Sequence, residues 1–167
     1  MHYNNLDDSI TTQTDAGSAQ HLMELADVHL QKLYETARYH ADIFWDNHMG
    51  ANKSGRDRAG SLGCRVRQKQ NSIYIEWYHN IWHRKRQGGF TPISKYIRKP
   101  ARSHGYNLES LFKYADPWEY PVIEQTEAAF AQIRRQNKNL AKIRRYLRDM
   151  HAAEEMLAEL ERTAAQV

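Results

Sequence analysis

Apolar residues recur every three or four positions in the N-terminal part of the chain, from about Ser18 to about Asn47. The series is Leu22, Leu25, Ala26, Leu30, Leu33, Ala37, Ala41 and Phe44. This spacing predicts an amphipathic helix of about 30 residues. From Met49 to Gly60, three glycines lie among basic residues, which predicts a flexible basic loop. Residues 1–17 are polar and aperiodic, and we expect a mobile tail there.

The period changes to strict alternation between Ser61 and Arg86. In the first part of this stretch, small apolar residues alternate with cations. The apolar positions are Leu62, Cys64 and Val66, and the basic positions are Arg65, Arg67 and Lys69. The second part carries Ile73, Ile75 and Trp77 on one side and Tyr74, Glu76, Tyr78 and Trp82 on the other. With the polar joint 70–72 between them, the two parts predict an antiparallel hairpin.

After the hairpin, glycine and proline residues mark the turns and the limits of the next elements. Residues 87–89 predict a turn, and residues 90–97 supply a third strand or a strand followed by a helical turn. Pro92 confines such a strand to the edge of a sheet, because proline cannot donate to the ladder. A second basic loop contains Arg98, Lys99 and Arg102. Asn107 is then expected to cap a short helix.

A very long helix is predicted at the C-terminal end, from about 117 to about 163. Asp116-Pro117 is a strong start signal, and neither glycine nor proline occurs after residue 121. Such a helix would be about 70 Å long. Its apolar residues follow a near-heptad seam typical of a coiled coil, namely Ile133, Leu140, Ile143, Leu147, Met150 and Leu157. We expect this helix to pack on the first helix or on a second copy, forming a homodimer.

Together these elements predict one α+β domain over residues 18–167, with a small antiparallel sheet of two or three strands between two long helices. At 167 residues the chain is about one domain. No apolar run approaches the roughly 20 residues that span a bilayer, and the N-terminus lacks signal-peptide features. The single cysteine, Cys64, agrees with a reducing compartment. We therefore expect a cytoplasmic protein with no membrane contact.

The net charge of +4 conceals a strong segregation along the chain. Residues 1–52 hold 2 Lys/Arg against 8 Asp/Glu, residues 53–102 hold 13 against 2, and residues 103–167 hold 9 against 10. A middle segment this basic requires a negative partner, either the acidic first helix or a phosphate backbone.

Cations interleaved with aromatic rings make the outer side of the hairpin the candidate DNA-binding surface. Cations hold phosphates, and exposed rings stack on bases. The candidate residues are Arg65, Arg67, Lys69, Tyr74, Tyr78, Trp82, Arg84, Lys85, Arg86, Arg98, Lys99 and Arg102. In the alternative interpretation, the rings lie beneath a helix and the cations pair with acids of the first helix. The cations between Arg134 and Arg148 are either a solvated face or a further phosphate contact, and the acidic block after them suits antiparallel helix pairing.

Catalytic or metal chemistry has little support in the residues. On a strand, His79 and His83 would lie about 13 Å apart, too far to share one metal ion. Glu76 is either a lone general base or, more in keeping with a hairpin, a cross-strand partner of Arg65 or Arg67. Cys64 alternates with core positions and is expected to be buried. Because no phosphate-binding glycine loop or nucleophile elbow occurs either, we expect a protein that is not an enzyme and needs no cofactor.

Three stretches carry a resemblance to a known family: LGCRVRQKQNSIYIEWYHN, YNLESLFKYADPWE and EQTEAAFAQIRRQNKNLAKIRR. From about Leu62 to about Arg145, the chain resembles the MobI family of mobilisation proteins of conjugative plasmids and integrative conjugative elements. The resemblance implies an accessory factor for DNA transfer that acts at the origin of transfer beside a relaxase, as part of the relaxosome. An adaptor that links the relaxase or secretion components through its long helix is the alternative, and a small nuclease using Glu76 and a metal ranks third.

Overall fold

The computed structural model describes residues 18–53 and 60–166. The predicted tail, residues 1–17, and most of the predicted basic loop, residues 54–59, lie outside the described residues. The fold is α+β, as the sequence predicts. Its elements are α1 (Ser18–Lys53), β1 (Leu62–Lys69), β2 (Ser72–Arg84), β3 (Phe90–Tyr96), α2 (Leu108–Phe112), a 3₁₀ turn η1 (Pro117–Glu119) and α3 (Tyr120–Ala164).

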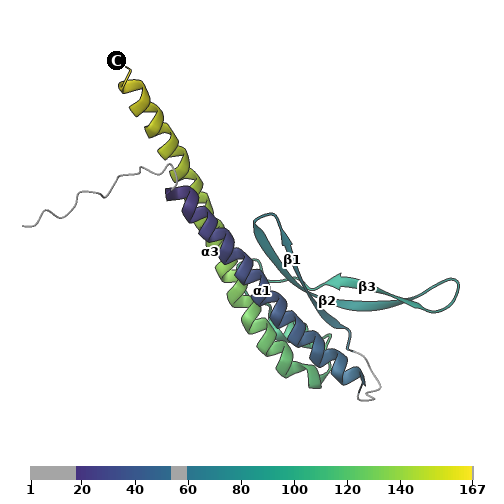
Figure 1. The fold of residues 1–167 in the computed structure, drawn as a ribbon. Helices are drawn as coiled ribbons and strands as arrows, with labels where there is room; N and C mark the ends of the chain where they lie inside the picture. Colours follow the sequence, from purple (N-terminus) through teal and green to yellow (C-terminus); the bar gives the residue numbers. More distant parts are fainter. Residues whose placement is uncertain (1–17, 54–59, 167) are drawn as a thin grey trace, which may run out of the picture.

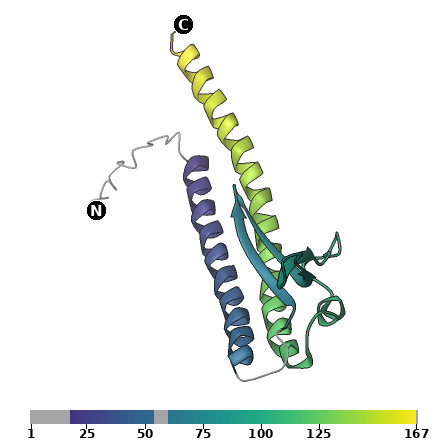
Figure 2. The same cartoon turned by 90° about the vertical axis from the view of Figure 1, so that its right-hand side faces the viewer.

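The two long helices lie side by side and antiparallel, and the sheet packs against one side of the pair (Figures 1 and 2). At one end, the Ser18 hydroxyl bonds to the Glu154 carboxylate. At the other end, His48 Nδ1 lies 3.1 Å from Glu119 Oε1, and both side chains are buried. Beyond Glu154, α3 continues to Ala164. The antiparallel helix pairing expected from the charge blocks is thus present within one chain.

Helix α1 ends at Lys53, later than the predicted end near Asn47. The predicted loop was wrong over residues 49–53. A glycine in an exposed helical position costs only about 1 kcal/mol, and Gly50 is such a position. The buried contact of His48 with Glu119 anchors this end of the helix, which offsets that cost.

The start of the long C-terminal helix is confirmed. The Asp116 backbone N–H donates to Glu119 Oε2 at 2.8 Å, which satisfies one of the free donors before the helix. The predicted seam, however, divides between two surfaces. Ile133, Leu140 and Leu147 are buried against α1, whereas Ile143, Met150 and Leu157 are exposed.

The sheet has the order β1-β2-β3 and is antiparallel throughout. Lys69 pairs with Ser72, so the first hairpin closes through a two-residue turn. Pro92 lies in β3 at the sheet edge, as predicted. Gly88 and Gly89 both have positive φ in the turn before β3, a conformation that favours glycine.

Trp77 lies at the centre of the core. It is fully buried, and its ring packs edge-on against Phe44 of α1 at 5.1 Å and at a tilt against Phe130 of α3 at 5.9 Å. The indole N–H donates to Glu127 Oε2 at 2.6 Å. One residue of β2 therefore joins both helices to the sheet.

Glu127 connects this core to the loop after β3 through a buried polar network. Its carboxylate accepts from Arg134 Nη1 at 2.9 Å and from the Tyr106 backbone N–H at 2.7 Å. Because each oxygen has charged or N–H partners, the network meets the requirement for burying a carboxylate. None of the described helices is long and apolar enough to traverse a bilayer.

Candidate nucleic-acid interface

Strand β2 consists of two halves with different surroundings. Residues 72–79 pair with β1 and pack on the helices, whereas residues 78–84 pair with β3. We call residues 80–96 the arm. From Ile81 to Tyr96, every side chain except that of Thr91 is exposed. Figure 1 shows the β2–β3 hairpin reaching away from the helices as a two-stranded ribbon.

The basic face is the side of the sheet turned away from the helices. Its cross-strand neighbours include Arg65 opposite Glu76 and Arg67 opposite Tyr74. Tyr74 is exposed and Tyr78 is half-buried. The interpretation that buries the rings beneath a helix is therefore wrong for Tyr74, and it is also wrong for Trp82, which lies on the arm and is exposed.

The two arginines of the basic face are held by neighbours on the same face. Arg67 Nη2 lies 2.6 Å from Glu76 Oε2 and donates to Tyr96 Oη at 3.0 Å. The Arg65 guanidinium lies over the Tyr78 ring at 5.1 Å and bonds to the same Tyr96 hydroxyl at 3.3 Å. The predicted cross-strand role of Glu76 is confirmed. These cations are oriented, but part of their hydrogen-bonding capacity is already used.

Tyr96 is a residue of this face that the sequence reasoning did not include. It pairs with Tyr78 across β2 and β3, so their side chains share a face. The alternation of Pro92, Ser94 and Tyr96 was the available signal. Alternation alone does not say which residue of β2 lies beside Tyr96. The register between the two strands decides this, and that register is set by the turn.

A glycine shapes this face beneath Tyr78. A Cβ added to Gly63 would lie 2.6 Å from Cζ of the Tyr78 ring, closer than any real contact. The bare backbone therefore lets the ring lie flat on β1. Partial burial raises the pKa of Tyr78, and the nearby Arg65 charge opposes that shift. The phenol remains neutral at physiological pH.

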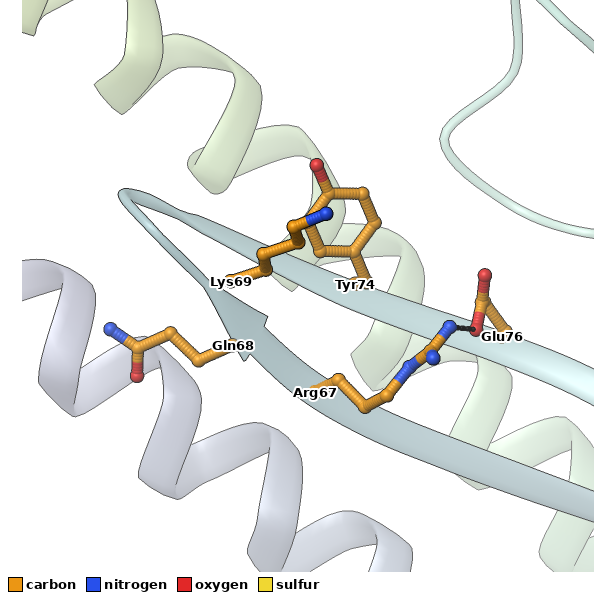
Figure 3. A pocket seen from close by; sticks show the side chains of 5 residues that line it. All are labelled: Arg67, Gln68, Lys69, Tyr74 and Glu76. Atoms are coloured by element: carbon orange, nitrogen blue, oxygen red, sulfur yellow. Dashed lines mark hydrogen bonds and ion pairs between the residues drawn. The ribbon is translucent and has the colours of Figure 1, made fainter.

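An open hollow of about 460 Å³ lies at the end of the first hairpin, lined by Arg67, Gln68, Lys69, Tyr74 and Glu76. Figure 3 shows the Lys69 and Tyr74 side chains on one side of the hairpin, with Arg67 directed at Glu76. Gln68 points away from them (Figure 3). A cation beside an exposed ring is an arrangement that suits a phosphate with its attached base.

The arm carries the least restrained cations and rings. Arg84 ends β2, Lys85 and Arg86 follow at its tip, and all three are exposed. Trp82 and Phe90, both on the same face of the ribbon, are 58% and 63% exposed. In the sequence no Asp or Glu occurs between Glu76 and Glu109, so nothing within the arm neutralises this charge.

The sequence model of the MobI protein family matches residues 33–148, which is 116 of the 167 residues. This chain belongs to the MobI family. The match confirms the resemblance noted between Leu62 and Arg145 and extends it into α1. It includes the whole sheet and the arm. Membership gives the protein a role related to mobilisation. No curated protein and no solved structure matches the chain.

The second basic loop of this MobI protein lies beside α3. Lys99 Nζ donates to the backbone oxygens of Ser103 and Pro100. Partial burial lowers the pKa of Lys99, and repulsion from Arg134 adds to the shift. The Lys99 ammonium therefore already makes hydrogen bonds within its own loop, whereas Arg98 and Arg102 are exposed. The three loop residues extend the basic area toward α3.

The seven cations of α3 between residues 134 and 148 fall into two groups, those bound to acids and those exposed to solvent. Arg134 is bound to Glu127, and Arg144 forms an ion pair with Asp27 of α1. The other five are exposed, namely Arg135, Lys138, Lys142, Arg145 and Arg148. Desolvation lowers the pKa of His104, and several of these cations lower it further. The five exposed cations therefore form a second cationic area on α3 of the MobI chain. The charge run alone did not show that Arg134 and Arg144 are bound to acids instead.

The remaining reactive side chains have structural surroundings. Cys64 is buried as predicted, and burial raises the pKa of its thiol to about 12. His79 lies on β2 and stacks on the Tyr114 ring at 3.9 Å. Within residues 18–53 and 60–166, no group of three or more His, Cys, Asp or Glu side chains is arranged to hold a metal ion.

Proposed function

We propose that this MobI protein is a non-catalytic DNA-binding accessory factor of conjugative transfer. It binds the origin of transfer in the cytoplasm, beside a relaxase, and needs no cofactor. The observation that carries the proposal is the arm, an exposed two-stranded ribbon that ends in Arg84, Lys85 and Arg86 and contains no acid. The family supports the mobilisation role, and the arm supports DNA as the partner.

The dimensions of a β-ribbon support contact with a duplex. The major groove of B-DNA, about 12 Å wide, admits a two-stranded ribbon. Cations at the tip would then reach phosphates on either side of the groove, and the exposed Trp82 ring would meet bases or sugars. Rings inserted beside bases also favour unstacking, which fits a factor that positions or opens the duplex for a relaxase.

We rank the candidate residues by how free their side chains are of partners within the protein. Arg65 and Arg67 already bond to Tyr96, and Arg67 also pairs with Glu76. The tip cations have no such acidic neighbour in the arm. We therefore assign the larger share of phosphate binding to the arm and a smaller share to the basic face, in which Lys69 and Tyr74 contribute at the hollow.

The test compares two triple variants with the same change in charge. Arg84, Lys85 and Arg86 all changed to Glu should abolish measurable binding to origin DNA in a gel shift. Lys32, Arg38 and Lys113, exposed cations of the helical part, changed to Glu form the control and should retain it. With wild-type protein, the logarithm of affinity should fall steeply with the logarithm of salt, by roughly 0.9 per phosphate contact.

Equal loss of binding in both variants would mean that only net charge matters, and equal retention would remove the arm from the interface. Retention in the arm variant would favour the alternative, an adaptor that links the relaxase or secretion components through α3. Exposed apolar side chains near the end of α3, such as Leu157 and Leu160, are the observation behind that alternative.

A further inference from the structure

An uncovered apolar stripe runs along the C-terminal half of α3. Its residues are spaced alternately by three and four, and its five large members are between 47% and 60% exposed. The α3 stripe consists of Ile143, Tyr146, Met150, Ala153, Leu157 and Leu160. Alternating spacing of this kind is the pattern of a helix that pairs with another helix over its length. Within the described chain, α1 covers a different side of α3, the side of Leu140 and Leu147.

The stripe faces away from the sheet. Arg134 and Asn137 bond to the backbone of β2, at Ile75 O and at Ile73, and so mark the side of α3 that meets the sheet. At about 100° per residue, Tyr146 and Met150 lie on roughly the opposite side of the helix. A partner on the stripe would therefore leave the basic face and the arm accessible.

We propose that a second copy of this chain binds the α3 stripe in antiparallel orientation. The stripe is complementary to itself in that direction. Ile143 lies opposite Leu160 of the second copy, Tyr146 opposite Leu157, and Met150 opposite Ala153. One two-fold axis between residues 151 and 152 satisfies all three pairs at once, which is the condition for a closed two-fold dimer. A large side chain also meets a small one at the centre.

Charge on one flank of the stripe selects the antiparallel direction. Lys142 and Arg145 lie at one end of this flank, Asp149 lies near its middle and Glu159 at the other end, and all four are exposed. Antiparallel pairing brings Arg145 of each copy beside Glu159 of the other. In a parallel pair, the two copies of this flank would lie on opposite sides of the dimer, so these charges would not meet and would give no attraction. The self-complementary pattern of both shape and charge is what identifies a second copy as the occupant.

The first test is the mass of the full chain by sedimentation equilibrium at micromolar concentration. Wild type should be a dimer, and Met150→Asp should weaken dimerisation by about a hundredfold or more, because two-fold symmetry removes the buried side chain twice. Val28→Asp is the control, since Val28 is 53% exposed on α1 and lies outside the stripe. It should remain dimeric. Unchanged circular dichroism shows that both variants fold.

The second test exchanges the charges. Arg145→Glu alone and Glu159→Arg alone should each weaken the homodimer by about tenfold, because two attractive contacts become repulsive. Mixing the two variants should restore dimers of wild-type affinity, since each pair is then opposite in sign. Restoration also separates this contact from the ion pair that Glu159 makes with Arg162 within one helix, which mixing cannot repair.

Three results would overturn the proposal. If the wild type is a monomer, the α3 stripe does not bind a second copy and would serve a different protein partner. Dimers that survive Met150→Asp place the interface elsewhere. Single charge variants with wild-type affinity exclude the antiparallel direction. None of these outcomes depends on whether the protein binds DNA, because mass and gel shift are separate measurements.

Discussion

The two halves of β2 contain similar residues in very different situations. Trp77 in the packed half is fully buried and donates to Glu127, whereas Trp82 in the arm is 58% exposed. Trp77 points to the helix side of the strand, whereas Trp82, five residues later, points to the opposite side. The difference arises from what lies beside them, since helices cover one half and only β3 accompanies the other.

In the packed half, the edge of β2 that does not pair with β1 is covered by side chains of α3. Asn137 donates to Ile73 O and accepts from Ile73 N, and Arg134 donates to Ile75 O. These side chains replace the missing third strand, because buried backbone groups need partners. In the arm, β3 provides the partners instead. The packed half consequently supports stability, and the arm is available for recognition.

The largest expected effect tests the packed half. Glu127→Ala should lower the free energy of unfolding by about 3–5 kcal/mol, because it leaves Arg134, whose side chain is only 10% exposed, without its counter-charge. The Trp77 indole and the Tyr106 backbone N–H lose their acceptor at the same time. Urea denaturation measures the loss. Glu124→Ala, an exposed change on the same helix, should cost less than about 0.5 kcal/mol. A similar cost for both changes would mean that the network does not stabilise the fold.

The next effect tests the arm. Trp82→Ala should change the free energy of unfolding by less than about 0.5 kcal/mol. Its binding to a single-stranded oligonucleotide of the origin should weaken by about 1–3 kcal/mol, the value of one stacked base. Fluorescence anisotropy measures the binding, and Tyr39→Ala on α1, another exposed aromatic, is the control. A large loss of stability with unchanged binding would reverse the assignment of the two halves.

Local signals predicted most of the fold. The periodicities predicted α1, the first hairpin and α3, and the turn signals offered β3 as one of two alternatives. Asn107 does cap α2, with its side chain accepting from Glu109 N at 3.0 Å. Each of these signals acts within a few residues of the element it specifies. The end of α1 was the exception, because the contact between His48 and Glu119 is distant in sequence.

Tertiary contacts decided what the sequence could not predict about the site. The side of β2 that carries Ile73, Ile75 and Trp77 continues with His79, Ile81 and His83, but the alternation of a strand does not by itself say where the covering helices end. Arg134 and Arg144 belong to one basic run, but Arg134 is bound to Glu127 two turns earlier in α3, and Arg144 is bound to Asp27 of α1. Tyr96 joined the basic face only through the register of β3 with β2.

The smallest expected effect concerns the ion pair between Arg67 and Glu76 on the basic face. Glu76→Gln removes a partly exposed ion pair, so unfolding should become easier by only about 0.2–1 kcal/mol. DNA binding should become slightly tighter, because Arg67 is released and one repulsive carboxylate is lost. Glu109→Gln makes the same change in charge at an exposed position of α2 and is the control for the gel shift. If the two variants bind DNA alike, Arg67 acts only within the sheet, and the arm carries the recognition alone.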